Sequence, residues 1–355
     1  MLGSSQGTIP KSAIKYTQLT PESEWKQGCL KIELPKHVRR KVLGLIVVVA
    51  ICFVIVIYSC VNCNLSCSGM CEVLGQTPSH PSDNLSHDFS NVSQPHVGPY
   101  EQRLPHCIII GVRKAGTRAL LTYLNTHPDI VQRTKETHFF DRDDSYVEGL
   151  EYYRSLMPFS YQDQITVEKT PAYFVETLAP ERIYRMNSSI RLLLIVRDPV
   201  TRLISDYEQL TLKAASHKRV PLENLVIDEN GEVNVHYKPV QISMYYKFFP
   251  KWTEFFDSSQ IHVVDGDSFI QNPYPLLYKV ESFLGLGHKI PAEDFYYNET
   301  KGFYCYKGFD MPCLGASKGR PHHDVNEEVI DELRNFFRPR NRLFYAMVNQ
   351  SFEWP

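Results

Sequence analysis

The chain has 355 residues, of which 43% are hydrophobic and 22% are charged, and its formal net charge is -2. This composition excludes a disordered chain, because it supplies enough apolar mass for one large core or two modest ones. The near-neutral charge excludes an overall basic protein, so any anionic partner must meet a local basic cleft.

An uncharged apolar segment near the N-terminus predicts a membrane anchor. Residues 42–59 are eighteen apolar or small residues, about the length that crosses a bilayer as a helix. A cleaved signal peptide is disfavoured because forty-one residues precede this segment. Residues 1–41 hold eight Lys or Arg and residues 60–100 hold none, which predicts a cytosolic tail and a lumenal or extracellular C-terminal part. A buried core helix is the alternative.

Residues 60–103 are rich in Ser, Pro, Asn, Gly and His and lack periodicity, which predicts a lumenal stem. We expect the folded domain over residues 104–355. Six Asn-x-Ser/Thr triplets are candidate glycosylation sites and fit the lumenal side. They are Asn64, Asn84, Asn91, Asn187, Asn298 and Asn349.

Nine cysteines are distributed unevenly along the chain. Cys305 and Cys313 flank a short segment with Gly308 and Pro312, which predicts an intrachain disulfide in an oxidising compartment. Such a bond contributes about 2 to 3 kcal/mol if it is unstrained. Four more cysteines lie within residues 60–71. A disulfide between the stems of two chains is an open alternative there, whereas a zinc site would need a second pair of ligands that does not follow.

Residues 107–124 predict a strand, a phosphate-binding loop and a helix. Residues 108–110 are three isoleucines typical of a buried parallel strand, and Gly111 and Gly116 permit a sharp turn. Thr117 then opens an amphipathic helix whose free N–H groups face an anion. Plain α/β packing without a ligand is the alternative for any such turn.

Two cations inside this turn, Lys114 and Arg118, favour the phosphate-binding interpretation. The spacing Gly-x4-Gly-Thr resembles a Walker A loop as far as Thr117. The next residue, however, is Arg118, and the lysine, Lys114, lies inside the loop. An ordinary nucleoside triphosphatase is therefore disfavoured.

Strands and helices alternate from residue 104 onward, and the strands are uniformly apolar, which predicts an α/β fold with a parallel sheet flanked by helices. The loops after Ile110, Val167 and Val196 should then converge on one cleft at the carboxyl ends of the strands. Residues 215–240 are polar and irregular and predict an insertion loop. Further strands are expected at 165–169, 191–196 and 261–266, and helices at 117–126, 178–187, 199–213, 274–284 and, broken at Pro339, 325–349.

Arg197 follows the strand over 191–196, and Ser205 lies one to two turns into the next helix. Together they can grip a second phosphate, which a nucleotide with a 3′-phosphate requires. A surface pair between Arg197 and Asp198 is the alternative.

Glu136, His138 and Asp141 fall close together among aromatic residues. On a strand, Glu136 and His138 share one face by the period of two. Apolar surroundings would raise the pKa of Glu136 and the histidine would tune it, which makes Glu136 a candidate general base. A structural pair is the alternative, and a metal site would need a third ligand that the sequence does not place.

Two further segments carry candidate binding groups. Lys169 ends a predicted strand and can neutralise anionic oxygens of a donor or an acceptor. Tyr304 and the basic turn over 317–323 flank the predicted disulfide, where the ring can stack on a base and the turn can hold a phosphate. A solvated basic loop is the alternative.

Six motifs, in their order and spacing, resemble the heparan sulfate glucosaminyl 3-O-sulfotransferases. They are GVRKAGTRALL, KETHFFD, EKTPAYF, IVRDPVTRLISDY, GFYC and SKGRPH, within residues 105–355. The resemblance implies a P-loop-like sulfotransferase fold that uses PAPS (3′-phosphoadenosine 5′-phosphosulfate), a type II location in the Golgi membrane with a lumenal catalytic domain, and a heparan sulfate acceptor. MNSSI at 186–190 and the closing WP are similar to the type 5 isoform.

The resemblance also implies functional residues. Glu136 matches the catalytic glutamate, with Lys114, His138 and Lys169 beside it. The donor would be held by Lys114, Ala115, Gly116, Thr117, Arg118, Arg197, Ser205, Tyr304, Lys318, Gly319, Arg320, Pro321 and His322. The acceptor would be held by Glu136, His138, Asp141, Lys169, Thr170, Pro171, Ala172 and Gln241. No obligatory metal ion is expected.

Two positions depart from the family's pattern. The family usually has Lys-Gly-Gly-Thr-Arg, so Ala115 is expected in a loop conformation where glycine is commoner, with a mild effect on donor affinity. After Gln241 the family often has Tyr-x-x-His-Leu, whereas residues 245–249 lack that histidine, which leaves acceptor specificity open.

The expected reaction is in-line sulfuryl transfer to the 3-hydroxyl of a glucosamine, with Glu136 as the base. PAPS-dependent transfer to another glycan position and an inactive heparan sulfate-binding membrane protein are the alternatives. A lumenal kinase would need metal carboxylates that the sequence does not offer in suitable places. No nucleic acid partner is expected, and the oligomeric state stays open.

Overall fold

The computed structural model describes residues 96–212, 219–308, 313 and 325–355, all within one compact unit that spans Asn91–Pro355. The predicted tail and anchor, most of the predicted stem, and Asn64, Asn84 and Asn91 lie outside the described residues. Within the described ranges, no helix combines the length and the apolar character needed to cross a membrane.

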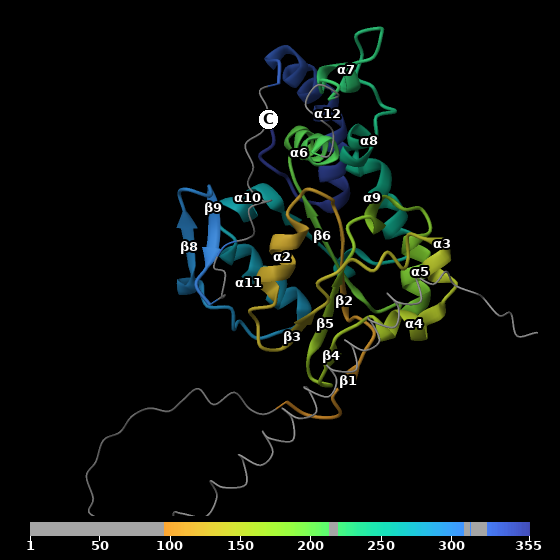
Figure 1. Cartoon of the computed structure of the whole chain (residues 1–355), viewed down its shortest axis with the longest axis vertical. Coiled ribbons are helices and arrows are strands. Elements are labelled where there is room, and N and C mark those ends of the chain that lie inside the picture. The colour runs from red at the N-terminus through yellow and green to blue at the C-terminus, as the bar shows by residue number, and fades with distance from the viewer. Residues whose placement is uncertain (1–95, 213–218, 309–312, 314–324) are drawn as a thin grey trace, which may run out of the picture. The chain divides into compact units, whose positions relative to one another are not determined.

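A five-stranded sheet forms the centre of the unit, in the order β3-β5-β2-β6-β7 (Figure 1). Every neighbouring pair is parallel, so the predicted parallel sheet is confirmed. The register places Ile109 of β2 opposite Lys169 of β5 and Leu193 of β6. The strands are β2 Cys107–Gly111, β3 Ile130–Gln132, β5 Ile165–Lys169, β6 Arg191–Val196 and β7 Ile261–Asp265.

The central strands are apolar along their whole length because helices cover both faces of the sheet. Alternate residues of β2 and β6 point to opposite faces: Ile108 packs in one hydrophobic cluster with α5, α9 and α12, and Ile109 in another with α2 and α11. In Figure 1 these two groups of helices lie on either side of the sheet. The structure is therefore a three-layer α/β fold.

The helices near the sheet follow the apolar patterns closely, with ends within about three residues of the predicted ones. The α-helices are α2 Thr117–Leu124, α3 Asp143–Tyr146, α4 Gly149–Ser155, α5 Ala179–Met186, α6 Pro199–Thr211, α7 Glu223–Val226, α8 Lys238–Ser243, α9 Tyr245–Thr253, α10 Gly266–Gln271, α11 Tyr274–Leu284 and α12 Glu327–Val348. Short 3-10 turns cover η1 Tyr173–Val175, η3 Ser258–Gln260 and η4 Ala292–Asp294.

Two small antiparallel sheets flank the central one. β1 (Glu101–Gln102) pairs with β4 (Phe159–Ser160), so the end of the predicted stem already contacts the domain. β8 (Phe295–Asn298) pairs with β9 (Phe303–Tyr306). The disulfide between Cys305 and Cys313 connects β9 to the segment that follows it.

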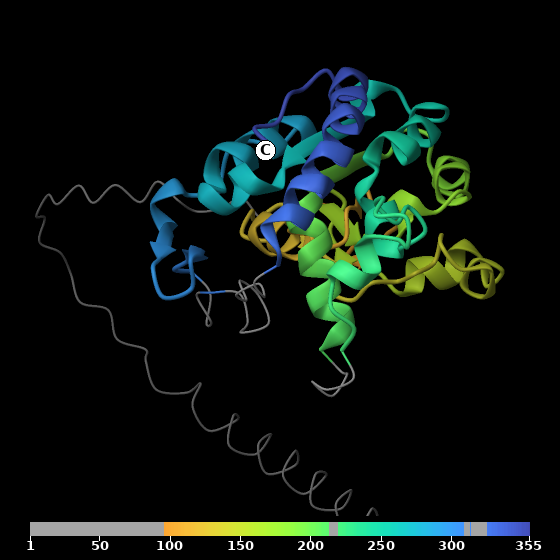
Figure 2. The ribbon, with the colours of Figure 1, turned by 90° about the horizontal axis from the view of Figure 1, so that it is seen from above.

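The predicted break at Pro339 is wrong, because α12 continues through the proline (Figure 2). A proline inside a helix removes one N–H donor and usually kinks the helix. Here Leu333 and Phe337 before the proline and Phe344 after it are all buried, and α12 packs on both α6 and α9. Tertiary packing on both sides of Pro339 therefore keeps the helix continuous.

The prediction of an irregular insertion over residues 215–240 is wrong in part. Its described portion contains α7 and an isolated antiparallel bridge between Ile227 and Val233. Val226, Val233 and Val240 are buried in a cluster with α6 and α12. These scattered apolar residues fold the segment onto the domain despite its polar composition.

Candidate active site

A cavity of about 710 Å³ opens at the carboxyl ends of the central strands. The loops after β2, β5 and β6 all contribute to it, as the parallel sheet predicts. Of the predicted site residues, those that line it are Lys114, Gly116, Thr117, Arg118, Glu136, His138, Lys169, Pro171, Ala172, Arg197, Ser205 and Tyr304.

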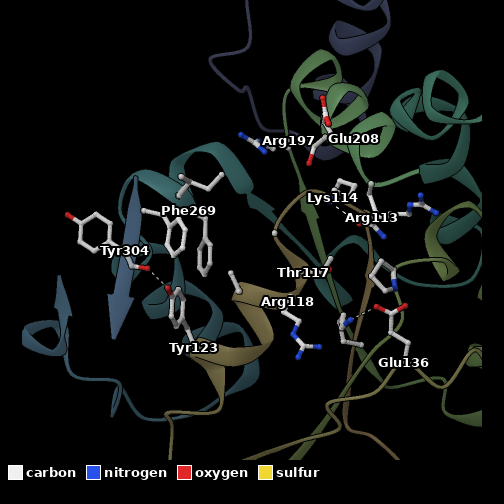
Figure 3. A pocket seen from close by; sticks show the side chains of 18 of the residues that line it. Arg113, Lys114, Thr117, Arg118, Tyr123, Glu136, Arg197, Glu208, Phe269 and Tyr304 are labelled. Atoms are coloured by element: carbon white, nitrogen blue, oxygen red, sulfur yellow. Dashed lines mark hydrogen bonds and ion pairs between the residues drawn. The ribbon is translucent and has the colours of Figure 1, made fainter. Parts of the chain in front are cut away.

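The loop over residues 112–116 joins β2 to α2, and Arg113, Lys114 and Gly116 of this loop line the cavity. Gly116 precedes α2 and has no side chain to cap the first N–H groups of the helix, so these groups can meet an anion. Lys114 and Arg118, which lie on either side of Thr117, add two cations to the lining of the cavity (Figure 3). The local geometry is that of an anion-binding loop.

The expectation that Ala115 takes a glycine-like conformation is wrong. Positive φ angles fall instead on Lys114 at 74° and Gly116 at 108°. Ala115 is fully buried, and its carbonyl lies against Gly266, where any Cβ would come within 2.5 Å of the Ala115 oxygen. Gly266 thus allows α10 to approach the loop closely, and Ala115 acts through packing.

A buried ion pair supports the loop from α6. Arg202 and Asp206 are fully buried, and Arg202 Nη1 donates to Asp206 Oδ2 at 3.0 Å and to the Arg113 carbonyl at 3.2 Å. Arg113 Nε donates in turn to Asp206 Oδ1 at 2.8 Å. Lys114 Nζ reaches the same helix at Gln209 Oε1, 3.0 Å away. These contacts fix the loop to α6 by both backbone and side chains.

Arg197 and Ser205 both line the cavity, as the interpretation of a second phosphate site requires. Arg197 Nε donates to Asp267 Oδ1 at 2.9 Å, and the Asp198 N–H donates to Asp267 Oδ2 at 2.7 Å. Tyr245 Oη donates to the Arg197 carbonyl at 2.8 Å. Arg197 is therefore oriented by α10 and α9, and the alternative pairing with Asp198 is not what the structure forms.

Glu136 and Lys169 form the ionic centre of the cavity. Lys169 Nζ donates to Glu136 Oε1 at 2.5 Å, although the two residues are far apart in the sequence. His138 Nε2 lies 3.5 Å from Glu136 Oε2, and His138 Nδ1 lies 2.8 Å from Asp141 Oδ2. Because an ionised carboxylate only accepts, Nδ1 carries the proton, which turns Nε2 toward Glu136.

The prediction that Glu136 and His138 lie on a strand is wrong. β3 ends at Gln132, and Glu136 and His138 follow in an irregular segment in which His138 has a φ of 51°. The segment bonds to side chains of the β5 loop instead of a neighbouring strand, as Thr137 N donates to Thr170 Oγ1 at 3.1 Å. The Glu136 side chain is 39% exposed and paired with Lys169, so apolar groups do not enclose it.

The carboxyl group that burial does affect is one residue before Lys169. Glu168 is fully buried, and this raises the pKa of Glu168 to about 7, although hydrogen bonds from Thr170 and Thr137 and the charge of Lys169 oppose the rise. The sequence did carry a signal for this residue, because Glu168 is the one carboxylate within the predicted strand over 165–169. On a strand covered on both faces it must have buried partners.

Aromatic side chains line the side of the cavity opposite Glu136 (Figure 3). Tyr123 Oη donates to the Tyr304 carbonyl at 2.5 Å, which joins α2 to β9. Phe269 of α10 lies beside them. The predicted partners Lys318 to His322 lie outside the described residues.

Four predicted site residues do not line this cavity. Ala115 and Thr170 are buried beneath it, Asp141 lies behind His138, and Gln241 lies on α8. Sequence reasoning in turn missed part of the lining. Four of these residues lie inside the quoted motifs without a role assigned to them, and the others lie outside any motif. The missed residues are Arg113, Ala119, Tyr123, Glu208, Gln209, Phe269, Ile270, Lys301, Gly302 and Phe303.

Comparisons with known proteins agree with this geometry. A family model described as the sulfotransferase domain matches residues 104–342, so the protein is a sulfotransferase. Heparan sulfate glucosamine 3-O-sulfotransferase 5 of Mus musculus is 49% identical over 282 residues, which are 76% of this chain and 81% of that protein. The chain belongs to the heparan sulfate glucosamine 3-O-sulfotransferase family.

Two further comparisons extend this result. Heparan sulfate glucosamine 3-O-sulfotransferase 3B1 of Mus musculus is 43% identical over 272 residues, covering 75% of this chain and 68% of that protein. The crystal structure of a sulfotransferase from Alicyclobacillus acidocaldarius has a TM-score of 0.52 at 20% identity and covers 70% of this chain and 98% of that chain. It shows the same fold.

Proposed function

We propose that this protein transfers the sulfuryl group of PAPS to the 3-hydroxyl of a glucosamine in heparan sulfate. The observation that carries the proposal is one cavity that holds both the cationic loop after β2 and the paired Glu136 and Lys169. The names of the relatives supply the acceptor class. Most of the rate would come from positioning and electrostatic stabilisation.

The residues that line the cavity suit a nucleotide that carries phosphate groups at both the 3′ and the 5′ position of its ribose. The loop with Lys114 and Arg118 offers N–H groups and two cations for the 5′-phosphosulfate. Arg197, held by Asp267, and Ser205 offer donors for the 3′-phosphate. The aromatic wall opposite Glu136 suits a base, so the sulfur would lie between the loop and the carboxylate.

In the proposed reaction Glu136 acts as the general base. It takes the proton of the acceptor hydroxyl while that oxygen forms a bond to sulfur. The bond between sulfur and the bridging phosphate oxygen breaks, and PAP (3′-phosphoadenosine 5′-phosphate) leaves with the electron pair. Lys114 and Lys169 stabilise negative charge on the oxygens of the transferring group, and Asp141 orients His138 beside Glu136.

Sulfate transfer by the full-length protein in detergent tests the proposal. Radiolabelled PAPS and N-sulfated heparan sulfate are the substrates, and disaccharide analysis locates the label. We expect label on the 3-oxygen, and Glu136→Gln should lower kcat by about 10²- to 10⁴-fold with unchanged affinity for PAP. Label at another position would overturn the acceptor assignment alone, whereas heparan sulfate binding without turnover would overturn the reaction.

We also propose a single-pass type II location in the Golgi membrane, with residues 42–59 as the anchor and the catalytic domain in the lumen. The charge asymmetry around this segment and the disulfide between Cys305 and Cys313 support it. Asn187, Asn298 and Asn349 would then be open to glycosylation, as would the three sequons of the stem. Protease digestion of sealed Golgi vesicles tests the orientation, because it should remove the tail and spare the domain.

A further inference from the structure

A fully buried carboxylate lies beneath the paired Glu136 and Lys169. Glu168 is on β5, one residue before Lys169, and none of its side chain is exposed. Val167 packs in the cluster with α2, so by the period of two Glu168 points to the other face, beside the hydroxyls of Tyr153 and Tyr173. A carboxylate in such apolar and aromatic surroundings costs stability unless its partners compensate.

The partners of Glu168 come from the two segments that carry the paired groups of the cavity. Glu168 Oε1 accepts from Thr170 Oγ1 at 2.5 Å and from Thr137 Oγ1 at 3.1 Å. Thr170 directly follows Lys169, and Thr137 directly follows Glu136. One oxygen atom therefore connects the segment of the proposed base to the segment of its lysine partner.

The direction of these hydrogen bonds is set by the carboxylate. Thr137 donates its one hydroxyl hydrogen to Glu168 Oε1, so its oxygen accepts from Tyr173 Oη at 2.7 Å, and Tyr173 Oη accepts from the Phe139 N–H at 3.2 Å. The Thr170 hydroxyl also donates to Glu168 Oε1, and its oxygen accepts from the Thr137 N–H at 3.1 Å. Both hydroxyls end on Oε1, because a carboxyl oxygen that carries no proton accepts and does not donate.

We propose that Glu168 is a positioning residue for sulfuryl transfer, which fixes Glu136 relative to Lys169 by accepting hydrogen bonds from Thr137 and Thr170. The proposal rests on the proposed function of the cavity. Glu168 does not line the cavity, so the proposed role is not one of contact with a substrate. Its other oxygen, Oε2, is buried without a hydrogen-bond partner among the described residues.

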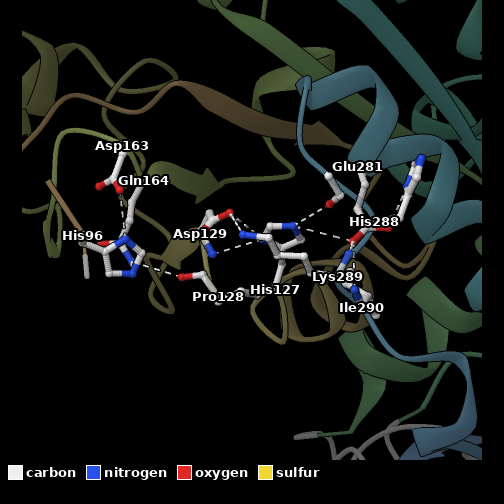
Figure 4. Close-up of polar contacts among 11 residues, drawn as sticks. His96, His127, Pro128, Asp129, Asp163, Gln164, Glu281, His288, Lys289 and Ile290 are labelled. Carbon is white, nitrogen blue, oxygen red and sulfur yellow. Dashed lines mark hydrogen bonds and ion pairs between the residues drawn. The ribbon is translucent and has the colours of Figure 1, made fainter. Parts of the chain in front are cut away.

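The chain offers a matched control in Glu281 of α11 (Figure 4). Glu281 is also fully buried, and its Oε1 accepts from the N–H groups of Lys289 at 2.9 Å and Ile290 at 3.0 Å. Figure 4 places it among His127, Lys289 and Ile290, none of which lines the cavity. Glu281 Oε2 also lies 3.3 Å from His288 Nδ1. Replacing either glutamate therefore removes a buried carboxylate that accepts at least two hydrogen bonds, but only Glu168 is connected to the paired groups.

Steady-state sulfate transfer and calorimetric binding of PAP by the full-length protein test the proposal. Glu168→Leu should lower kcat by about 10- to 100-fold, because small misplacements of reacting groups have effects of this size. PAP affinity should stay within about twofold, since the donor loop over residues 112–116 lies outside the hydrogen-bond network of Glu168. Glu168→Gln should keep more of kcat than Glu168→Leu, because the amide oxygen still accepts both hydroxyls. Glu281→Leu should lower the melting temperature and leave kcat unchanged.

A double-mutant cycle tests the connection itself and does not depend on Glu168→Leu being well folded. Thr137→Val should lower kcat in the wild type and add little in Glu168→Gln or Glu168→Leu, because both changes break one network. Fully additive effects, or a Glu168→Leu variant with wild-type kcat, would overturn the positioning role. Equal losses of kcat in the two Glu168 variants, or parallel losses in Glu281→Leu, would overturn it too. A wild-type protein that transfers no sulfate would instead overturn the proposed function.

Discussion

Replacing the buried Glu168 by glutamine should make the domain more stable at neutral pH, and the gain should depend on pH. Burial raises the pKa of Glu168 from its usual 4.5 to about 7, and the hydroxyls of Thr170 and Thr137 and the charge of Lys169 only partly oppose this. Glutamine has a similar shape to the protonated acid and does not ionise. Glu168→Gln therefore removes the ionisation without emptying the site.

The sign follows from comparing the folded and unfolded chains. In the unfolded chain Glu168 loses its proton near pH 4.5, whereas in the folded domain it does so only near pH 7. The unfolded state thus binds fewer protons between these values, so the free energy of unfolding of the wild type falls as pH rises through this window. The difference between the two pKa values, at about 1.4 kcal/mol for each pH unit, corresponds to a loss of about 3 kcal/mol in the free energy of unfolding.

Urea unfolding followed by tryptophan fluorescence measures this effect, since Trp252 is fully buried in the same domain. The free energies of unfolding of the wild type and Glu168→Gln are compared at pH 5, 6, 7 and 8. The difference in favour of the variant should grow by about 3 kcal/mol at most across this range and level off above about pH 7. A difference that stays constant from pH 5 to pH 8 would refute the reasoning.

Three further predictions concern the cavity and the disulfide. Lys169→Met should lower kcat by about 10²- to 10³-fold with little change in PAP affinity, measured by label transfer and calorimetry, because it removes a cation beside the transferring group. Arg197→Ala should weaken PAP binding by about 10- to 100-fold and leave adenosine 5′-phosphate binding unchanged, since only PAP carries the 3′-phosphate; equal weakening of both ligands would count against the second phosphate site. Cys313→Ser should lower the free energy of unfolding by about 2 to 3 kcal/mol, because the bond to Cys305 closes a loop with a sequence separation of 8, and an unchanged denaturation midpoint would contradict this.

The sheet was predictable from the sequence because its inner strands are buried on both faces. The predicted strands over 165–169 and 191–196 match β5 and β6 residue for residue. Such strands admit few polar residues, so their ends stand out against the loops. Knowing the strand ends also placed the cavity, since parallel strands end at one edge.

The local conformations around the cavity were not predictable in the same way. The segment with Glu136 and His138 has the alternation of a strand, but the N–H groups of Thr137 and Phe139 bond to side chains of Thr170 and Tyr173, which follow β5. Alternation in the sequence predicts which face a side chain points to only if the segment pairs with a neighbouring strand. Here side-chain hydroxyl groups accept the backbone hydrogen bonds that such a strand would accept. In the loop over residues 112–116 the positive φ angles fall on Lys114 and Gly116 and not on Ala115, which is packed against Gly266.

The two sides of the cavity rest on buried ionic groups of different kinds. Beneath the donor loop, Asp206 accepts hydrogen bonds from Arg113 and Arg202, so both of its carboxylate oxygens have partners. Beneath Glu136 and Lys169, Glu168 has one satisfied oxygen and one buried oxygen without a partner in the described part of the chain. Apolar residues of similar volume would often give a domain at least as stable. Apolar contacts, however, tolerate sliding, whereas hydrogen bonds to a fixed carboxylate specify distance and direction, and sulfuryl transfer depends on the placement of a base, a lysine and a donor within a fraction of an ångström.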